Sequence, residues 1–160
     1  MLSVTILCVG RLKEKFYKDA ADEYAKRLSA YCKLEIVELA EQRLPAKPSP
    51  GQIRAALDRE GSAVFARLPR DGKLVALCVE GTPMSSEGLA RTLGNWTVGG
   101  MSSLTLIIGG SCGLSPRVKE RADLRLSMSE MTFPHHLARV MALEQLYRAF
   151  KIREGSDYHK

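Results

Sequence analysis

The sequence predicts an α/β fold with a mainly parallel sheet flanked by helices, and three observations point to it. Short apolar runs alternate with longer segments in which apolar residues recur every three or four positions, as strands and helices require. Leu74–Val79 is apolar throughout, as is typical of a strand buried on both faces of a parallel sheet, and Leu104–Ile108 (LTLII) is a second run of this kind. The chain has no internal repeat, so we predict a single domain over residues 1–160.

In the first half of the chain, the sequence pattern predicts two strands and two helices. Apolar residues recur every four positions from Phe16 to Leu28 and so line one face of a helix. Three prolines fall within Pro45–Pro50, which is therefore a loop, and Gly61 argues against an unbroken helix after it. In chain order we expect a strand at Leu2–Val9, a helix over 16–28, a strand at Leu34–Leu39 and helical spacing over 53–68.

The second half predicts three strands and three helices. The pairs Thr82-Pro83 and Ser115-Pro116 each place an N-cap residue before a proline suited to the first helical turn. After Pro134, apolar residues repeat at spacings of four and three, as on one helix face. We expect strands at Leu74–Val79, Leu104–Ile108 and Leu124–Met128, and helices from 82–83 to about Trp96, from 115–116, and over 136–150.

The charge balance favours a polyanionic partner. Lysine and arginine number 24 against 18 aspartates and glutamates, which gives a formal net charge of +6. No long apolar run is present, so nucleic acid is favoured over membrane, although a merely soluble basic surface would give the same balance. The N-terminal segment resembles a first strand and not a signal peptide, so we expect a cytoplasmic protein with reduced thiols.

Several familiar sites are excluded by their missing motifs. The four cysteines, at 8, 32, 78 and 112, form no Cys-x-x-Cys pair and have no histidine at ligand spacing, so we predict no metal site. The chain also lacks G-x-G-x-x-G, the P-loop motif and G-x-S-x-G, which removes the main support for dinucleotide-binding, P-loop and α/β-hydrolase interpretations.

Three predicted strand ends carry glycine or small polar residues. These are Glu80-Gly81-Thr82, Gly109–Gly113 and Ser127–Phe133. In parallel sheets ligands bind at the carboxyl ends of the strands, and glycine lets the backbone approach a ligand closely. Plain turn chemistry would also explain each segment taken singly. Cys112 is a candidate nucleophile with no basic partner near it in sequence, and His135-His136 suit capping or packing at a helix start.

Three segments together resemble one family. They read LIIGGSCGLSPRV at 106–118, LRLSMSEMTFPHHLARVMALEQLYRAFKI at 124–152, and YHK at the end of the chain. They are similar to the small SPOUT-superfamily methyltransferases of the RlmH family, which modify a pseudouridine of large-subunit ribosomal RNA. The likeness covers the whole chain, and its most specific part is the block from Ser127 to Phe150.

The resemblance implies a fold and a cofactor that the strand-and-helix pattern does not. SPOUT proteins thread their C-terminal segment through a loop, which makes a trefoil knot, and they bind S-adenosylmethionine mostly through backbone groups of the knotted loops. The family works as a homodimer, for which the helix over 136–150 is a candidate face. Many relatives have proline and glutamate where this chain has Ser111-Cys112, which argues against catalysis by Cys112. The implied cofactor-binding residues are Leu77, Gly109, Met128, Ser129, Glu130, Met131, Thr132 and Phe133.

The resemblance further implies methyl transfer to N3 of a pseudouridine in the helix 69 loop of 23S ribosomal RNA, within the assembled ribosome. We expect an in-line displacement at a dimeric site. An imide nitrogen must lose its proton to attack, and His159 is the only group of the closing motif that titrates near neutrality, so it is our candidate base or proton relay. Tyr158 would position it, and Lys160 would hold phosphate or the developing anion.

Other interpretations stay open from the sequence. Arg139 and Arg148 on the last predicted helix suit either contact with the RNA backbone or ordinary helix-surface charge. His159 would be a solvated tail residue if the C-terminus frays. The protein as a whole would alternatively be a basic RNA-binding accessory protein without catalysis, or a methyltransferase of the same family with a different target base.

Overall fold

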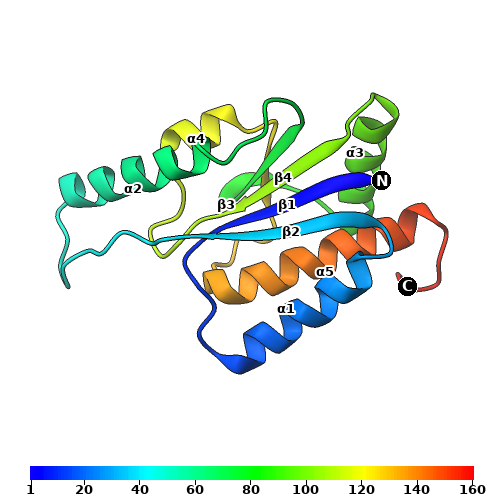
Figure 1. The fold of residues 1–160 in the computed structure, drawn as a ribbon, viewed down its shortest axis with the longest axis horizontal. Helices are drawn as coiled ribbons and strands as arrows, with labels where there is room; N and C mark the ends of the chain where they lie inside the picture. Colours follow the sequence, from blue (N-terminus) through cyan, green and yellow to red (C-terminus); the bar gives the residue numbers. More distant parts are fainter.

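Five strands pair into one sheet in the order β2-β1-β4-β3-β5, and all four neighbouring pairs are parallel (Figure 1). The computed structural model describes residues 1–160, and the predicted α/β fold is confirmed. The strands are β1 (Leu2–Val9), β2 (Cys32–Leu39), β3 (Lys73–Pro83), β4 (Ser103–Ile108) and β5 (Leu124–Ser127). The helices are α1 (Lys15–Leu28), α2 (Pro50–Phe65), α3 (Ser86–Val98), α4 (Pro116–Arg121) and α5 (His135–Arg153).

The helices cover both faces of the sheet, and each face has its own apolar core. Alternate side chains of a strand point to opposite faces, so Ile6 packs with α1, α3 and α5, while the next residue, Leu7, packs with α2 and α4. In β4, Leu106 and Ile107 divide in the same way. Figure 1 shows α1 and α5 below the sheet and α2 with α4 above it. No helix combines the length and apolar character that crossing a membrane requires.

Serine N-caps begin three of the helices. Ser49 and Gln52 form a capping box at the start of α2, with each side chain accepting a hydrogen bond from the other residue's backbone N–H. Ser115 accepts from the N–H of Val118, with Pro116 in the first turn of α4, as the sequence predicts. A β-carbon on Gly61 would lie 2.6 Å from Oγ of Ser115. Gly61 therefore lets α2 approach the start of α4, and α2 passes through it unbroken.

Strand β3 is longer than predicted, and this moves the start of the following helix. It continues to Pro83, where Thr82 pairs with Leu126 after a shift in register between Leu77 and Thr82. The expected helix start at Thr82-Pro83 is therefore wrong, and α3 begins at Ser86 with Ser85 as its N-cap. Val79 is 46% exposed, so the outer part of this run is not buried on both faces as predicted.

Helix α5 lies between α1 and α3 on one face of the sheet, and its buried face differs from the predicted one. Of the positions predicted to form its apolar stripe, only Leu143 is fully buried. Since α5 contacts a helix on either side as well as the sheet, its covered surface extends beyond a single stripe. The buried residues of α5 are Arg139, Ala142, Leu143, Leu146 and Ala149.

Candidate active site

A pocket of about 650 Å³ lies at the carboxyl edge of the sheet. All strands are parallel, so the outer part of β3 (residues 77–80) and the segments that follow β4 and β5 meet at this edge and form the pocket walls. The three glycine-rich or small polar strand ends identified in the sequence therefore come together in space. All but one of the expected cofactor-binding residues line this pocket, namely Leu77, Gly109, Met128, Ser129, Met131, Thr132 and Phe133. The exception is Glu130.

The loop after β4 is a tight turn that only glycine permits. A β-carbon on Gly109 would lie 2.4 Å from the carbonyl oxygen of Gly113, a distance that real side chains do not reach. The N–H of Gly113 donates to the carbonyl of Gly110 at 3.0 Å, and Gly113 has a φ of +80°, in the left-handed region. The chain thus presents backbone with little side-chain cover on this side of the pocket.

The segment after β5 folds back on itself through serine side chains. Oγ of the buried Ser127 donates to the carbonyl of Ser129 at 3.0 Å, and Oγ of Ser129 accepts from the N–H of Met131 at 3.0 Å. These bonds replace the strand pairing that ends at Ser127. They hold the run 128–133 as a compact turn against the pocket before α5 begins.

An ion pair and two thiols also border the pocket. Lys119 of α4 pairs with Glu80 at the end of β3, and its hydrogen bond lowers the pKa of the Glu80 carboxyl. No sequence pattern predicts this pair, since the two residues are far apart in the chain. Cys78 and the exposed Cys112 also line the pocket, and burial raises the pKa of Cys78. No cluster of three or more potential metal ligands is present.

His135, the first residue of α5, lines the same pocket. Burial lowers the pKa of its imidazole, and the neighbouring His136 lowers it further. The ring centroids of the two histidines lie 4.2 Å apart, and His136 also contacts Tyr17 of α1 edge-on. Both side chains therefore pack at the start of α5, which agrees with one of the two roles that the sequence suggested for them.

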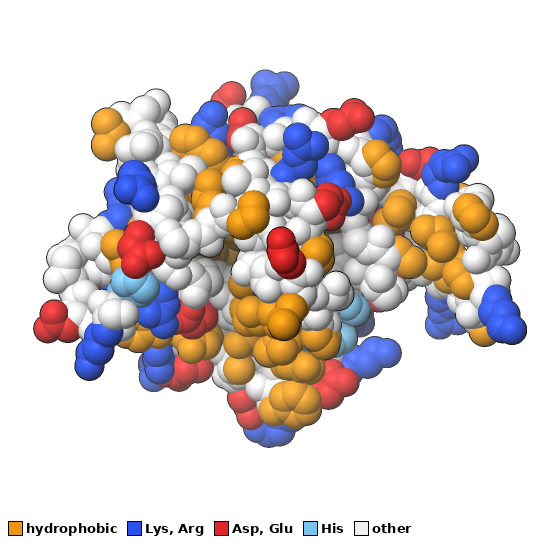
Figure 2. Space-filling model, turned by 180° about the vertical axis from the view of Figure 1, so that it is seen from behind, with side chains coloured by type: hydrophobic (Ala, Val, Ile, Leu, Met, Phe, Trp, Pro, Cys, Tyr) orange, Lys and Arg blue, Asp and Glu red, His pale blue; other side chains and the backbone are white.

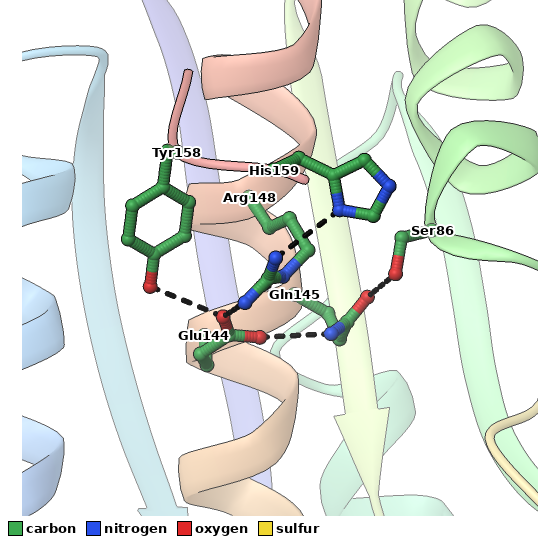
Figure 3. A network of polar contacts seen from close by, with 6 residues as sticks. All are labelled: Ser86, Glu144, Gln145, Arg148, Tyr158 and His159. Carbon is green, nitrogen blue, oxygen red and sulfur yellow. Dashed lines mark hydrogen bonds and ion pairs between the residues drawn. The ribbon is translucent and has the colours of Figure 1, made fainter. Parts of the chain in front are cut away.

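The C-terminal tail is tied to α5 and α3 by the polar network drawn in Figure 3. Glu144 is its centre: the carboxylate accepts from Nε of Arg148 at 2.9 Å, from Nη2 of Arg148 at 2.5 Å and from the hydroxyl of Tyr158 at 3.2 Å. Gln145 joins the network by donating to Glu144 and accepting from Ser86. Burial raises the pKa of Tyr158, and the Glu144 carboxylate adds to this shift.

His159 has a contact at each ring nitrogen. Its Nδ1 lies 3.1 Å from Nη1 of Arg148, and its Nε2 lies 2.7 Å from a carboxylate oxygen of Glu87 on α3. His159 is therefore held at two points, and the frayed, solvated tail that the sequence left open is not what the structure contains. Lys160, the last residue, is exposed.

Within one chain, the tail and the pocket are separate. None of Tyr158, His159 and Lys160 lines the pocket. The network borders a second, mostly apolar hollow of about 440 Å³, which Glu144 and Gln145 help to line. The two hollows share residues of the sheet and its edge, namely Leu77, Leu126 and Met128. The expected catalytic residues of the tail thus lie beside the smaller hollow, and the expected cofactor-binding residues line the neighbouring pocket.

The two arginines predicted on α5 have different positions. Arg148 is partly exposed and belongs to the tail network, with its guanidinium 4.8 Å from the centre of the Tyr158 ring. Arg139 is only 3% exposed. Its guanidinium donates to Glu38 at 2.8 Å and to the carbonyl of Gly10 at 3.1 Å. Both predicted roles of Arg139, RNA contact and surface charge, require a surface position, so they are wrong for this residue.

Comparison with known proteins places this arrangement among methyltransferases. A family model described as "Predicted SPOUT methyltransferase" matches residues 2–159. The chain is 46% identical to the ribosomal RNA large subunit methyltransferase H of Clostridioides difficile (strain 630) over 159 residues, covering 99% of this chain and 100% of that protein. It is 48% identical to the protein of the same name from Clostridium novyi (strain NT), with the same coverage.

A solved structure also shares the fold. It is that of a probable methylase family protein from Haemophilus influenzae Rd KW20, with a TM-score of 0.55 and 12% sequence identity. The match covers 100% of this chain and 72% of that one. At this level of identity the match concerns the fold alone.

Proposed function

The chain belongs to the SPOUT methyltransferase family, and on that premise we propose that it methylates N3 of a pseudouridine in the helix 69 loop of 23S ribosomal RNA. Membership makes the protein an enzyme that uses S-adenosylmethionine as its methyl donor. The target base and its place in the ribosome are our proposal, as are a trefoil knot at the C-terminal segment and a cytoplasmic location.

One observation carries the assignment of the donor site. Three strand ends that are distant in sequence form a single pocket, and its volume of about 650 Å³ lies in the range of small-molecule sites. The pocket fits S-adenosylmethionine, since glycine backbone at Gly109 and the folded run 128–133 can bind a ligand mostly through N–H and C=O groups. When bound, the cofactor supplies an electrophilic methyl group on a sulfonium.

Ribosomal RNA is the substrate that best fits the chain's relatives and its charge. The relatives are named for large-subunit ribosomal RNA, and this chain carries a formal net charge of +6. Basic side chains neutralise phosphates and hold RNA near the site. N3 of pseudouridine is an imide nitrogen, so the enzyme must take up its proton as the nitrogen attacks the methyl group in line. Much of the rate then comes from holding the two reactants aligned.

His159 is our candidate for the group that takes the proton, directly or as a relay. Tyr158 would position it, and Lys160 would hold a phosphate or the developing imide anion. In the network His159 already has a partner at Nδ1 and another at Nε2. We therefore propose that the RNA displaces the Arg148 contact when it binds, which frees Nδ1 for the imide proton.

We further propose that two copies form each active site. The tail residues do not line the pocket of their own chain, so a partner's tail would complete it. Figure 2 shows hydrophobic side chains gathered near the lower centre of one face of the molecule. Met131, at the pocket, is 73% exposed, and an apolar surface of this kind favours contact with another protein chain. The half-exposed residues of α5 are candidates for the same contact.

Two measurements test the proposal. Calorimetry of the folded protein with S-adenosylmethionine should show binding, whereas its absence would favour the RNA-binding accessory protein. Mass mapping of 23S ribosomal RNA from a deletion strain should show one methyl group missing from the helix 69 loop. Loss of a methyl group elsewhere would keep the family's chemistry and overturn the proposed target.

A further inference from the structure

Glu41, in the loop between β2 and α2, holds the glycine loop of the pocket without lining the pocket itself. One oxygen of its carboxylate accepts two hydrogen bonds from Ser111, from the backbone N–H at 2.8 Å and from the hydroxyl at 2.6 Å. A β-carbon on Gly110 would lie 2.6 Å from the same oxygen. The carboxylate thus lies directly against the backbone of 110–111, in space that any larger residue at 110 would occupy.

The order of the strands makes this contact possible. Strand β1 lies between β2 and β4, so a residue just beyond β2 must reach across the end of β1 to touch the loop after β4. Gly10 directly follows β1, and a β-carbon there would lie 3.4 Å from the second carboxylate oxygen of Glu41 and 3.6 Å from Nε2 of His135. These are ordinary van der Waals distances, and it is the φ of +105° that favours glycine at this position.

The loop that carries Glu41 is itself anchored. The N–H of Gln42 donates to Glu60 of α2 at 2.8 Å, and Glu60 is only 7% exposed. This fixes the backbone next to Glu41 to a helix packed on the sheet. Burial raises the pKa of Glu41, but the hydrogen bonds from Ser111 outweigh it and lower the pKa overall. The carboxyl is therefore ionised at neutral pH, and both of its bonds to Ser111 are charge-assisted.

We propose that Glu41 is a positioning residue for binding of the methyl donor, an inference that rests on the proposed function of the pocket. Three glycines make the loop 109–113 flexible in isolation, and ordering such a segment on binding costs affinity. The carboxylate of Glu41 orders the loop beforehand through Ser111. The loop 109–113 therefore has its binding conformation before the donor arrives, although Glu41 does not touch the donor.

The test is the affinity of the full-length protein for S-adenosylmethionine, measured by calorimetry for wild type and Glu41→Gln. Glutamine keeps the size of the side chain but removes the charge, and its amide can turn an N–H toward the N–H of Ser111. We expect the dissociation constant to rise about tenfold. Steady-state rates should show a higher KM for the donor and an unchanged kcat at saturating donor, because the reacting groups are untouched. A general loss of folded protein would lower kcat instead.

Glu35→Gln is the matched control, because Glu35 is an exposed glutamate of β2 and its loss changes net charge equally. Its affinity should equal that of wild type. Ser111→Ala removes the hydroxyl donor and should weaken binding less than Glu41→Gln, and the double variant should be less than additive since both act through one contact. Unchanged affinity in both Glu41→Gln and Ser111→Ala overturns the inference. If wild type itself fails to bind the donor, the proposed function fails instead.

Discussion

Nη1 of Arg148 lies 3.1 Å from Nδ1 of His159, within reach of a hydrogen bond to that ring nitrogen. A guanidinium has donors only, so Nδ1 must be the unprotonated nitrogen. The ring hydrogen then lies on Nε2, which donates to Glu87 at 2.7 Å. In this arrangement the lone pair of Nδ1 is engaged by Arg148, so His159 can accept a proton there only once that contact is released.

Replacing His159 tests its proposed role as base. His159→Ala should lower kcat by roughly 10²- to 10⁴-fold, the usual contribution of a general base. The acid limb of the pH–rate profile should also disappear, because that limb reports protonation of the base. Asp157→Asn, an exposed change in the same tail, serves as the control and should keep both the rate and the profile. Turnover of His159→Ala with an unchanged pH profile means that another group takes the proton.

Gly109 provides a test of the pocket that does not depend on the reaction. A β-carbon at this position would lie 2.4 Å from the carbonyl oxygen of Gly113, so Gly109→Ala must displace the loop after β4. We expect the affinity for S-adenosylmethionine to fall by more than about tenfold. The matched control is Gly51→Ala in the first turn of α2, where the nearest atom is 3.9 Å away. Equal affinities in the two variants would place the donor elsewhere.

Mixing two impaired variants, at a donor concentration too low to saturate Gly109→Ala, tests whether each site takes its tail from the partner. His159→Ala keeps a working pocket, whereas Gly109→Ala keeps a working tail. If tails cross between subunits, the mixed dimer contains one site with both parts intact, and activity should return to as much as one site per mixed dimer. If each tail serves its own chain, every site in the mixture has a defect and the activity stays at the average of the two variants alone. A fully active protein that sedimentation shows to be a monomer would also refute the shared site.

The strands and most helices were predictable because their signals are local. The run Leu104–Ile108 is apolar except for Thr105, and Ser115 with Pro116 caps a helix within a few residues. The end of β3 was missed because its outer part is held by pairing with β5 and not by its own composition: Thr82 pairs with Leu126 across a shift in register. A Thr-Pro pair has the same local pattern whether a helix or a strand contains it.

The site was predictable only where its members end strands. Since parallel strands end at one edge, Gly109 and the run 128–133 had to lie near each other once the sheet was recognised. Glu41 and Arg139 gave no such signal. The contact of Glu41 with Ser111 depends on β1 lying between β2 and β4. Arg139 is buried against Glu38 of β2 and the carbonyl of Gly10, partners that the spacing along α5 does not reveal.

The thiols should report on the pocket through their very different reactivity. Burial raises the pKa of Cys8 to about 12 and that of Cys32 to about 11, so neither forms thiolate readily. Cys112 is exposed and lines the pocket. A disulfide reagent should therefore label Cys112 first, and S-adenosylmethionine should slow this labelling. Cys112→Ser should remove the fast phase, and a fast phase that the donor leaves unchanged would contradict binding beside the glycine loop.

Arg139 should stabilise the fold and contribute nothing to RNA affinity. Its guanidinium is paired with Glu38 and Gly10 inside the protein, while its Nε has no partner. Removing one member of a buried pair costs about 3–5 kcal/mol, and the Glu38 side chain is 35% exposed, so we expect about 2–3 kcal/mol for Arg139→Ala in urea unfolding. Glu38→Gln combined with Arg139→Met should recover part of this loss, since it leaves no unpaired charge.

The stabilisation that Arg139 and Glu38 give the fold should decrease as the pH falls. Burial raises the pKa of Glu38, but the hydrogen bonds from Arg139 and from the N–H of Leu12 outweigh it and lower the pKa overall. A carboxyl whose pKa is lower in the folded state stabilises the fold above its unfolded pKa and loses that contribution as the pH falls. Wild type should therefore lose stability between about pH 5 and pH 3, and Arg139→Ala should lose less over that interval.

The salt dependence of RNA binding should be the same in both proteins, because removing a phosphate contact would lower the slope by about one. If Arg139→Ala were as stable as wild type and its RNA affinity depended less steeply on salt concentration, Arg139 would contact the RNA after all, contrary to its buried position.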